Sequence, residues 1–415
     1  MKTYSKFHFG IQDGIRLQRG FADLQNCDIH TELGAVTGKY KLETESGSIV
    51  TSSCYSAVAP NGDTYFFSSE NGDIFKRTQD GTYSSIRTNP NGEHKGCVYY
   101  NGYIYYSTNT RLGRFDLNTT WVDDFQTLLA EANHSMEQFD LILYICNGNN
   151  IASVDDTGVF TSSALDLPTQ YEAVALQQFG DDLLVLGNAD YITDSKIFRW
   201  TTYSDSWSIS DPIKEPVFAF IDADNYVFVV AVSGRIYQFS GRTLSPVFKV
   251  PAYTNYNAQL TTTHKGKALV ANGNKIYSIF RKSVNTPFTL CGEYTATGTI
   301  KSIVASGDDL LVSSSVVENI GTDRANAVIT SPLYIKPASQ VEVSYYNLPT
   351  GTSIEIETKC DNGNWEAQTE IIDDEDWKKI ILKDDILNKR DLQVRVTLVA
   401  SGGLSPEIDK IIIQD

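Results

Sequence analysis

The residues best suited to acid–base chemistry are two pairs of adjacent aspartates. Asp181-Asp182 and Asp308-Asp309 each stand directly before the tripeptide Leu-Leu-Val. Two carboxylates on either side of a sugar could serve as the acid and base of a glycosidase. Asp is also favoured in tight turns, where its side chain accepts hydrogen bonds from the backbone. We therefore interpret both pairs as the same β-turn, repeated at corresponding positions.

The histidines are the next candidates for catalysis or metal binding. They are His8, His30, His94, His134 and His264. They lie far apart, and no Cys/His pair has the spacing of zinc ligands, so we expect each to be a surface residue of a turn. The phosphate loop, the GxGxxG and GxSxG motifs and the HExxH zinc motif are all absent from the sequence. The sequence thus predicts no catalytic, cofactor-binding or metal-binding residues, and a protein that is not an enzyme.

Three other polar motifs have structural interpretations. The tetrapeptide at 222–225 lacks the glycine and the distal Glu of a calcium loop, which predicts a turn. The acidic run at 373–376 is expected to be a solvated loop. Residues 361–365 are similar to the Asp-box turn of sialidases, but the motif is one residue short before Trp365 and has Lys359 in place of its serine. A β-turn with a packing tryptophan is the better interpretation.

Composition and charge restrict the classes of function. The 415 residues carry 34 basic and 51 acidic side chains, a net charge of −17, which argues against a protein that grips nucleic-acid phosphates. An acidic surface can still lie beside DNA that must slide past it, although simple solubility is the plainer explanation. The six cysteines are scattered and are expected to be buried thiols in a reducing cytoplasm. Neither a signal peptide nor a membrane-length apolar run is found, so we expect a soluble intracellular product.

A repeated strand pattern organises the middle of the chain. Within 217–282, short apolar runs alternate with turns rich in Gly and Asn, and the whole pattern occurs twice. Its third strand recurs about every 40 residues, and its anchors are Ile74, Arg114, Ile151, Ile197, Ile236, Ile276 and a position near Val316. Four strands in a unit of this length are typical of a β-propeller blade. The sequence predicts an all-β chain whose residues 47–334 form an irregular propeller of about seven blades.

The two ends of the chain do not follow this repeat. Residues 1–46 form an extended segment, which either supplies a closing strand to the last blade or docks as an arm on a neighbour. Residues 335–415 alternate apolar and polar side chains over several strands, which predicts a small β-sandwich, with a hinge at 335–338 where Pro337 interrupts a strand. Residues 124–133 and 376–389 are the two stretches that could be helical.

The order of these modules resembles the tail-nozzle and related tail proteins of short-tailed bacteriophages. The resemblance includes the turn at 32–37, the phrase at 329–334, the segment at 358–363 and the end of the sandwich at 392–396 and 405–406. It implies a virion tail protein, made in the host cytoplasm, that forms a ring of about six copies on an adaptor or portal. Such a ring would surround or close the DNA exit channel during genome ejection, and DNA would pass it transiently without specific binding.

A receptor protein that binds or degrades host-surface glycans is the alternative. It would need aromatic side chains such as Trp200, Trp207 or Tyr226 exposed over one end of the propeller channel. Large aromatic residues more often fill the core, so we expect these to pack between the blades. A cellular propeller scaffold is a third interpretation, but the chain has no WD or kelch signature.

Overall fold

The computed structural model describes most of the chain. The described residues are 2–4, 23–25, 27–28, 36–38, 40–131, 133–189, 194–204, 206–210, 212–281, 287–331, 333, 338–360, 363–372, 377–381 and 391–414. The turn expected at 32–37 (apart from 36–37), the hinge at 335–337, the acidic run at 373–376, His8 and His30 lie outside them. By its contacts the chain divides into two units, one with residues 44–274 and 296–319, the other with 1–43, 275–295 and 320–415. Among the described residues, no helix has the length and apolar character needed to cross a membrane.

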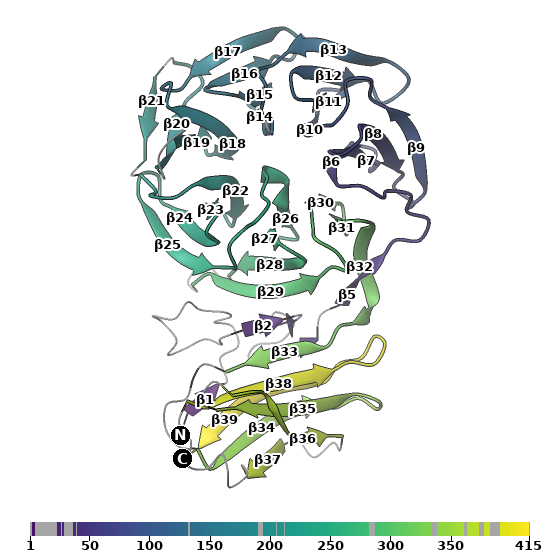
Figure 1. Cartoon of the computed structure of the whole chain (residues 1–415), viewed down its shortest axis with the longest axis vertical. Coiled ribbons are helices and arrows are strands. Elements are labelled where there is room, and N and C mark those ends of the chain that lie inside the picture. Colours follow the sequence, from purple (N-terminus) through teal and green to yellow (C-terminus); the bar gives the residue numbers. More distant parts are fainter. Residues whose placement is uncertain are drawn as a thin grey trace. The chain divides into compact units, whose positions relative to one another are not determined.

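Seven antiparallel sheets of four strands form the propeller, and Figure 1 shows them arranged around a common centre. The first four blades are β6 (Cys54–Val58), β7 (Thr64–Ser68), β8 (Asp73–Arg77) and β9 (Tyr83–Thr88); β10 (Gly96–Tyr100), β11 (Tyr103–Ser107), β12 (Arg111–Phe115) and β13 (Trp121–Thr127); β14 (Met136–Phe139), β15 (Ile142–Asn147), β16 (Asn150–Val154) and β17 (Phe160–Asp166); and β18 (Tyr171–Phe179), β19 (Asp182–Ala189), β20 (Ser195–Trp200) and β21 (Trp207–Ile209).

The last three blades complete the ring. They are β22 (Val217–Ala223), β23 (Tyr226–Ala231), β24 (Arg235–Phe239) and β25 (Leu244–Lys249); β26 (Thr261–His264), β27 (Lys267–Asn272), β28 (Lys275–Phe280) and β29 (Thr289–Thr295); and β30 (Ser302–Ser306), β31 (Asp309–Ser313), β32 (Val317–Arg324) and β5 (Tyr40–Thr44). A short 3-10 helix, η2 (Ala258–Leu260), precedes β26. The predicted all-β propeller of about seven blades is confirmed, and six of the seven predicted anchors lie in third strands.

The seventh blade is closed by the N-terminal part of the chain. Its outer strand is β5, which comes from within residues 1–46, so the structure selects the closing strand over the docked arm. Glu45 follows β5 directly and accepts hydrogen bonds from the Arg77 guanidinium (2.7 Å from Nε), the Tyr83 hydroxyl and the Asn319 amide. Arg77 Nη2 also lies 2.9 Å from Asp309 on β31. This charged cluster joins the first blade to the last where the ring closes.

The two stretches expected to be helical are not helices among the described residues. Residues 121–127 form β13, whose Trp121 and Val122 pair with Phe115 and Arg114 of β12. The outer edge of a blade offers a continuous row of backbone partners, and this outweighs the weak helical preference of the segment. The second stretch contains β37 (Trp377–Ile381), and its residues 382–389 are outside the described part of the chain.

The C-terminal strands form a sandwich of two sheets that also takes strands from the N-terminal segment. One sheet has the order β3-β4-β39-β34-β37, with β1 paired to β39, and the other has the order β2-β33-β38-β35-β36. The remaining bounds are β1 (Lys2–Tyr4), β2 (Asp23–Gln25), β3 (Cys27–Asp28), β4 (Val36–Gly38), β33 (Ala327–Thr330), β34 (Gln340–Asn347), β35 (Ser353–Lys359), β36 (Glu366–Ile371), β38 (Gln393–Val399) and β39 (Glu407–Gln414). The sandwich thus begins before the expected boundary at 335, because β33 is too short for its alternation to be recognised.

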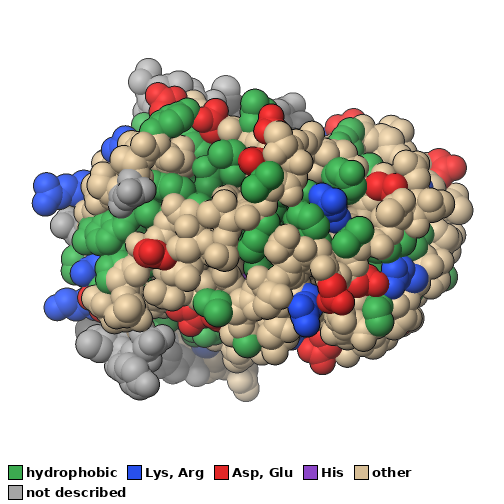
Figure 2. Space-filling model, turned by 90° about the horizontal axis from the view of Figure 1, so that it is seen from above, with side chains coloured by type: hydrophobic (Ala, Val, Ile, Leu, Met, Phe, Trp, Pro, Cys, Tyr) green, Lys and Arg blue, Asp and Glu red, His purple; other side chains and the backbone are tan. Residues whose placement is uncertain are grey.

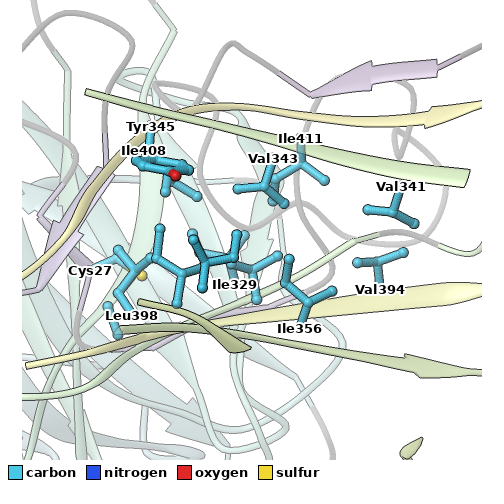
Figure 3. Close-up of a cluster of buried hydrophobic side chains, with 14 of the residues drawn as sticks. Cys27, Ile329, Val341, Val343, Tyr345, Ile356, Val394, Leu398, Ile408 and Ile411 are labelled. Atoms are coloured by element: carbon cyan, nitrogen blue, oxygen red, sulfur yellow. The ribbon is translucent and has the colours of Figure 1, made fainter. Parts of the chain in front are cut away.

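The sandwich core lies between the two sheets. Figure 3 shows Val341 and Val343 of one sheet facing Ile356 and Val394 of the other, and all four are buried. These are the inward-facing positions of the alternating pattern in the sequence. On β38, the Arg395 guanidinium stacks 4.0 Å from the ring centre of Trp365, the last residue of the motif similar to an Asp box. Trp365 is therefore a packing residue, as predicted.

The tight turn before β24 depends on a glycine. Gly234 has φ +85°, and a Cβ there would lie 2.1 Å from the carbonyl oxygen of Val250. We expect Gly234→Ala to lower the free energy of unfolding by about 1–2 kcal/mol for the left-handed backbone, with a further ~1–3 kcal/mol for the clash. Gly241→Ala is the matched control, because Gly241 has φ +83° and no atom within 4 Å of its Cβ position. Equal urea midpoints for the two variants would contradict this explanation.

Candidate functional site in the propeller channel

The first strand of every blade contributes to one central cavity. These strands stand around the centre of the ring in Figure 1, and the cavity between them has a volume of about 250 Å³. Its polar lining includes Lys95, Asn133, Glu137, Gln177 and Gln259. Its apolar lining consists of Met136, Ala175, Leu176, Phe220, Ile303 and Val304, among others. The cavity therefore combines a narrow apolar wall with a few hydrogen-bonding groups, which is the usual composition of a small-ligand site.

Gln259 extends from η2 across this channel. The side chain of Asn257 caps η2 by accepting a hydrogen bond from the backbone N–H of Gln259 at 2.8 Å. Gln259 Oε1 accepts a hydrogen bond from the backbone N–H of Ser56 at 2.8 Å, and its Nε2 lies 3.9 Å from the Cys97 sulfur. A residue of the sixth blade thus reaches strands of the first and second blades. The Gln259 side chain therefore bridges the channel at this level. A polymer as wide as a DNA duplex cannot pass through it.

Glu137 is the acidic group of the cavity lining. It lies on β14, and it remains partly accessible because it borders the cavity, although strands enclose it on most sides. Burial and, to a smaller extent, the charge of Asp222 raise the pKa of Glu137 to about 7, although a hydrogen bond from the backbone N–H of Gln178 opposes both. Lys95, a cationic residue of the same lining, is paired with Glu93 at 3.0 Å. A carboxyl group with this pKa exchanges its proton near neutral pH.

Three histidines are buried, so the expectation that they are surface turn residues was wrong. His94 has no exposed surface, stacks edge-on against Phe67, and its Nδ1 lies 3.0 Å from the carbonyl oxygen of Ser68. His134 is 1% exposed, and its Nδ1 lies 2.9 Å from the carbonyl oxygen of Cys146. His264 is also buried. An imidazole can be packed in a core when backbone carbonyls satisfy its N–H, which composition alone does not reveal.

A signal for two of these histidines was present in the sequence. His94 stands two residues before β10, and His134 stands two residues before β14. They are therefore equivalent positions of the repeat, one blade length apart. An alignment of the blades on their first strands would have identified a repeated structural role.

We expect the stability of the protein to fall in mild acid because of His94. Burial lowers the pKa of His94 from 6.5 to about 4. The unfolded chain then binds the proton more readily than the folded chain, so stability decreases as the pH falls from 6.5 towards 4, by about 3 kcal/mol. Urea unfolding at stepped pH values measures this decrease. The His94→Gln variant should start less stable and lose less on acidification, whereas parallel pH profiles would exclude His94 as the cause.

The two aspartate pairs are turn residues, and they lie in different blades of the propeller. Asp182, in the fourth blade, accepts a hydrogen bond from Arg199, and Asp309, in the seventh, from Arg77. Asp308 lies 3.2 Å from Lys265 on the surface. The interpretation as repeated turns is confirmed, because each pair lies at the turn between the first two strands of its blade. The tetrapeptide at 222–225 is likewise a turn, between β22 and β23.

The aromatic residues expected to matter for a glycan receptor are mostly packed. Trp200 is 3% exposed, stacks edge-on against Tyr144, and its Nε1–H donates to the carbonyl oxygen of Ser204. Trp207 is half-buried against Phe198 in the outer strand of the fourth blade. Tyr226, at a turn, is 37% exposed. Two of the three thus follow the expectation that they pack in or against the blades.

Two shallower cavities lie beside the channel on the loops of the second to fourth blades. One has a volume of about 650 Å³ and is lined by Asn91, Glu93, Lys95, Asn109 and Glu131, with Gly92 and Ala130. The other has a volume of about 300 Å³ and is lined by Leu129, Glu131, Gly148, Asn149, Thr169, Tyr171 and Glu172. They share Glu131, and the first shares Lys95 with the channel. We refer to these two adjoining cavities, with their acidic residues Glu93, Glu131 and Glu172, as the polar groove, which no sequence pattern predicted.

Known proteins resemble this chain in fold and not in sequence. No protein-family model matches the sequence, and no curated protein matches it. A streptogramin B lyase structure aligns with 68% of this chain and 96% of its own length, at 13% identity and a TM-score of 0.52. The virginiamycin B lyase from Staphylococcus aureus aligns with 68% of this chain and 98% of its own, at 12% identity and a TM-score of 0.50. The chain is an all-β protein with a β-propeller.

A third structure matches a larger share of this chain. The extracellular domain of a hybrid two component system from B. thetaiotaomicron aligns with 79% of this chain and 44% of its own length, at 12% identity and a TM-score of 0.52. At such low identities the likeness concerns the fold alone. The activities of these proteins are therefore not transferred to this chain.

Proposed function

We propose that this protein is a non-enzymatic structural subunit of a bacteriophage tail, a nozzle-like or hub-like ring component that surrounds or closes the DNA exit channel. The observation that carries the proposal is the order of modules. An N-terminal segment, a propeller and a terminal sandwich follow one another in the order of the short-tailed-phage proteins that the sequence resembles. In this chain the N-terminal segment also closes the propeller and adds strands to the sandwich. The propeller alone would not favour a tail over any other location, since many functions use this fold.

The use of the reactive side chains supports a structural role. The described histidines bond backbone carbonyls, as in the contacts of His94, His134 and His264 with Ser68, Cys146 and Asp308. The aspartates singled out in the turns pair with cations of their own or neighbouring blades. Groups held in this way stabilise the ring, which is compatible with a structural role.

The charge of the chain is compatible with a duct for DNA. A net charge of −17 would repel DNA phosphates and prevent sticking if acidic side chains face the duct. On the face of the molecule that Figure 2 shows, Lys and Arg side chains are distributed among acidic and apolar ones and form no continuous basic patch. Because Gln259 bridges the propeller channel, the duct we propose lies between subunits of a ring and not within one propeller.

Ring formation tests this proposal. The partners we propose are about six copies of the chain and an adaptor or portal protein of the same particle, with DNA passing only transiently. Mass photometry of the purified protein, alone and with an adaptor protein from the same particle, should detect a species of about six copies. A protein that stays monomeric under both conditions would contradict the ring.

Glycan binding is a second candidate, and the polar groove favours it. The amide side chains of Asn109 and Asn149 can donate and accept hydrogen bonds with sugar hydroxyls, and the carboxylates of Glu131 and Glu172 can accept them. A glycan array should then give hits that Asn149→Ala weakens. An array without hits would leave the tail proposal as the better account.

A further inference from the structure

We propose that the channel cavity binds a small aliphatic amine, held by the Glu137 carboxylate at its ammonium group and by the apolar channel wall along its alkyl chain. This proposal does not depend on the tail proposal. It concerns a site within one propeller.

The charged groups in and around the cavity favour a cationic ligand. Asp222 on β22 acts on Glu137 electrostatically, as a second negative charge. The other titratable groups of the lining are Lys95, Cys97, His134 and Tyr55, and burial raises the pKa of the Cys97 thiol, which keeps it neutral. Lys95 is already paired with Glu93, the burial of His134 lowers its pKa so that it is neutral, and the Tyr55 hydroxyl donates to Asn133. Among the described lining residues, Glu137 is thus the carboxyl group without a cationic partner, and an ammonium group would supply one.

The position of Glu137 along the channel supports the same assignment. Glu137 lies three residues beyond His134, which is about 10 Å further along an extended strand. It is therefore distant from the loops that carry Lys95 and Asn133. The backbone N–H of Gln178 hydrogen-bonds the Glu137 carboxylate, so Gln177 lies near Glu137 on the adjacent blade, and Gln259 lines the same cavity. The Gln177 amide oxygen would be the acceptor for a second ammonium group, since Gln259 Oε1 already accepts a hydrogen bond from the Ser56 backbone N–H.

The size and lining of the cavity define the rest of the ligand. A volume of about 250 Å³ is below the range of about 300–1,000 Å³ that holds drug-sized molecules, so the ligand must be small. The wall between the polar groups is formed by Met136, Leu176, Phe220 and Ile303. Methylene groups gain free energy when they leave water for such a wall. A mono- or diamine with a chain of about four carbons combines these features.

Titration calorimetry at pH 8 with butylamine, putrescine and 1,4-butanediol tests the proposal on the full chain. We expect both amines to bind and the diol, which has the shape of putrescine without its charge, to bind at least tenfold more weakly. Glu137→Gln should weaken amine binding at least tenfold, whereas Asp308→Asn, which changes an exposed turn acid, should leave it unchanged. Binding of the diol as tight as that of putrescine, or unchanged amine binding by Glu137→Gln, would overturn the proposal, as would no binding of either amine at 10 mM.

The pH dependence of wild-type binding provides a test that needs no variant. Since the pKa of Glu137 is about 7, the carboxylate is mostly protonated at pH 6 and mostly ionised at pH 8. Amine affinity should therefore rise about tenfold between these pH values. A flat profile would contradict the role of Glu137. Glu137→Gln should itself fold, because it replaces a group whose ionised form is disfavoured by its surroundings.

Discussion

Replacement of Arg77 by methionine is expected to lower the free energy of unfolding by about 3–5 kcal/mol. The Arg77 side chain is 5% exposed and lies between Glu45, which is 14% exposed, and Asp309. Its loss leaves the Glu45 carboxylate enclosed with the Tyr83 hydroxyl and the Asn319 amide as its remaining donors. An enclosed charge without its counter-ion costs much more than the pair contributes. Urea unfolding followed by tryptophan fluorescence measures the difference.

A matched control separates this cluster from ordinary surface pairs. Lys41 and Asp323 also form an ion pair, at 3.0 Å, but their side chains are 44% and 47% exposed. Lys41→Met should therefore cost less than about 1 kcal/mol. The double variant Arg77→Met with Glu45→Met should be more stable than the single Arg77 variant, because no enclosed charge remains. An Arg77 variant as stable as the Lys41 variant would show that the cluster does not hold the ring closed.

Deletion of residues 1–45 should have the largest effect and abolish cooperative folding. It removes β5, so β32 becomes an unpaired edge of the seventh blade, and it also removes Glu45. The same deletion takes β1, β2, β3 and β4 from the sandwich. Exposed sheet edges promote association, so the truncated chain should be largely insoluble on expression. Solubility and circular dichroism melting curves test this.

A shorter deletion distinguishes the loss of blade closure by β5 from a general effect of truncating the N-terminus. Removal of residues 1–5 takes away β1 alone, which pairs with Ile411, Ile412 and Ile413 of β39. Because the propeller keeps β5, this variant should stay soluble with a moderately lower melting temperature. Equal behaviour of the two deletions would contradict closure by β5.

The repeat was predictable because a blade is a local structure. Its turns are short, its strands are consecutive, and its third strand returns about every 40 residues, so anchors such as Ile74, Ile151 and Ile236 could be placed from spacing alone. Asp182 and Asp309 were recognised as turn residues for the same reason. Local patterns in the sequence report local pairing.

The features that depend on distant contacts were not predictable. Gln259 is one amide in a polar loop, and its reach to Ser56 follows from how seven blades meet at the centre. The burial of His94 and His134 depends on carbonyl groups brought from neighbouring strands. The strand β33 was assigned to the propeller because its four residues carry too little alternation, although the resemblance to phage proteins placed the start of the sandwich at 329–334. The composition of the cavity likewise emerges only when the first strands of all blades are assembled.

Labelling of particles with a gold-conjugated antibody tests the central claim most directly. Particles released by a host that carries the gene would be labelled for this protein and viewed by negative-stain electron microscopy. The account predicts label at the tail, near the adaptor or the distal tip. Label on projecting fibres would contradict the nozzle role and favour the glycan receptor, and particles without any label would contradict a virion location altogether.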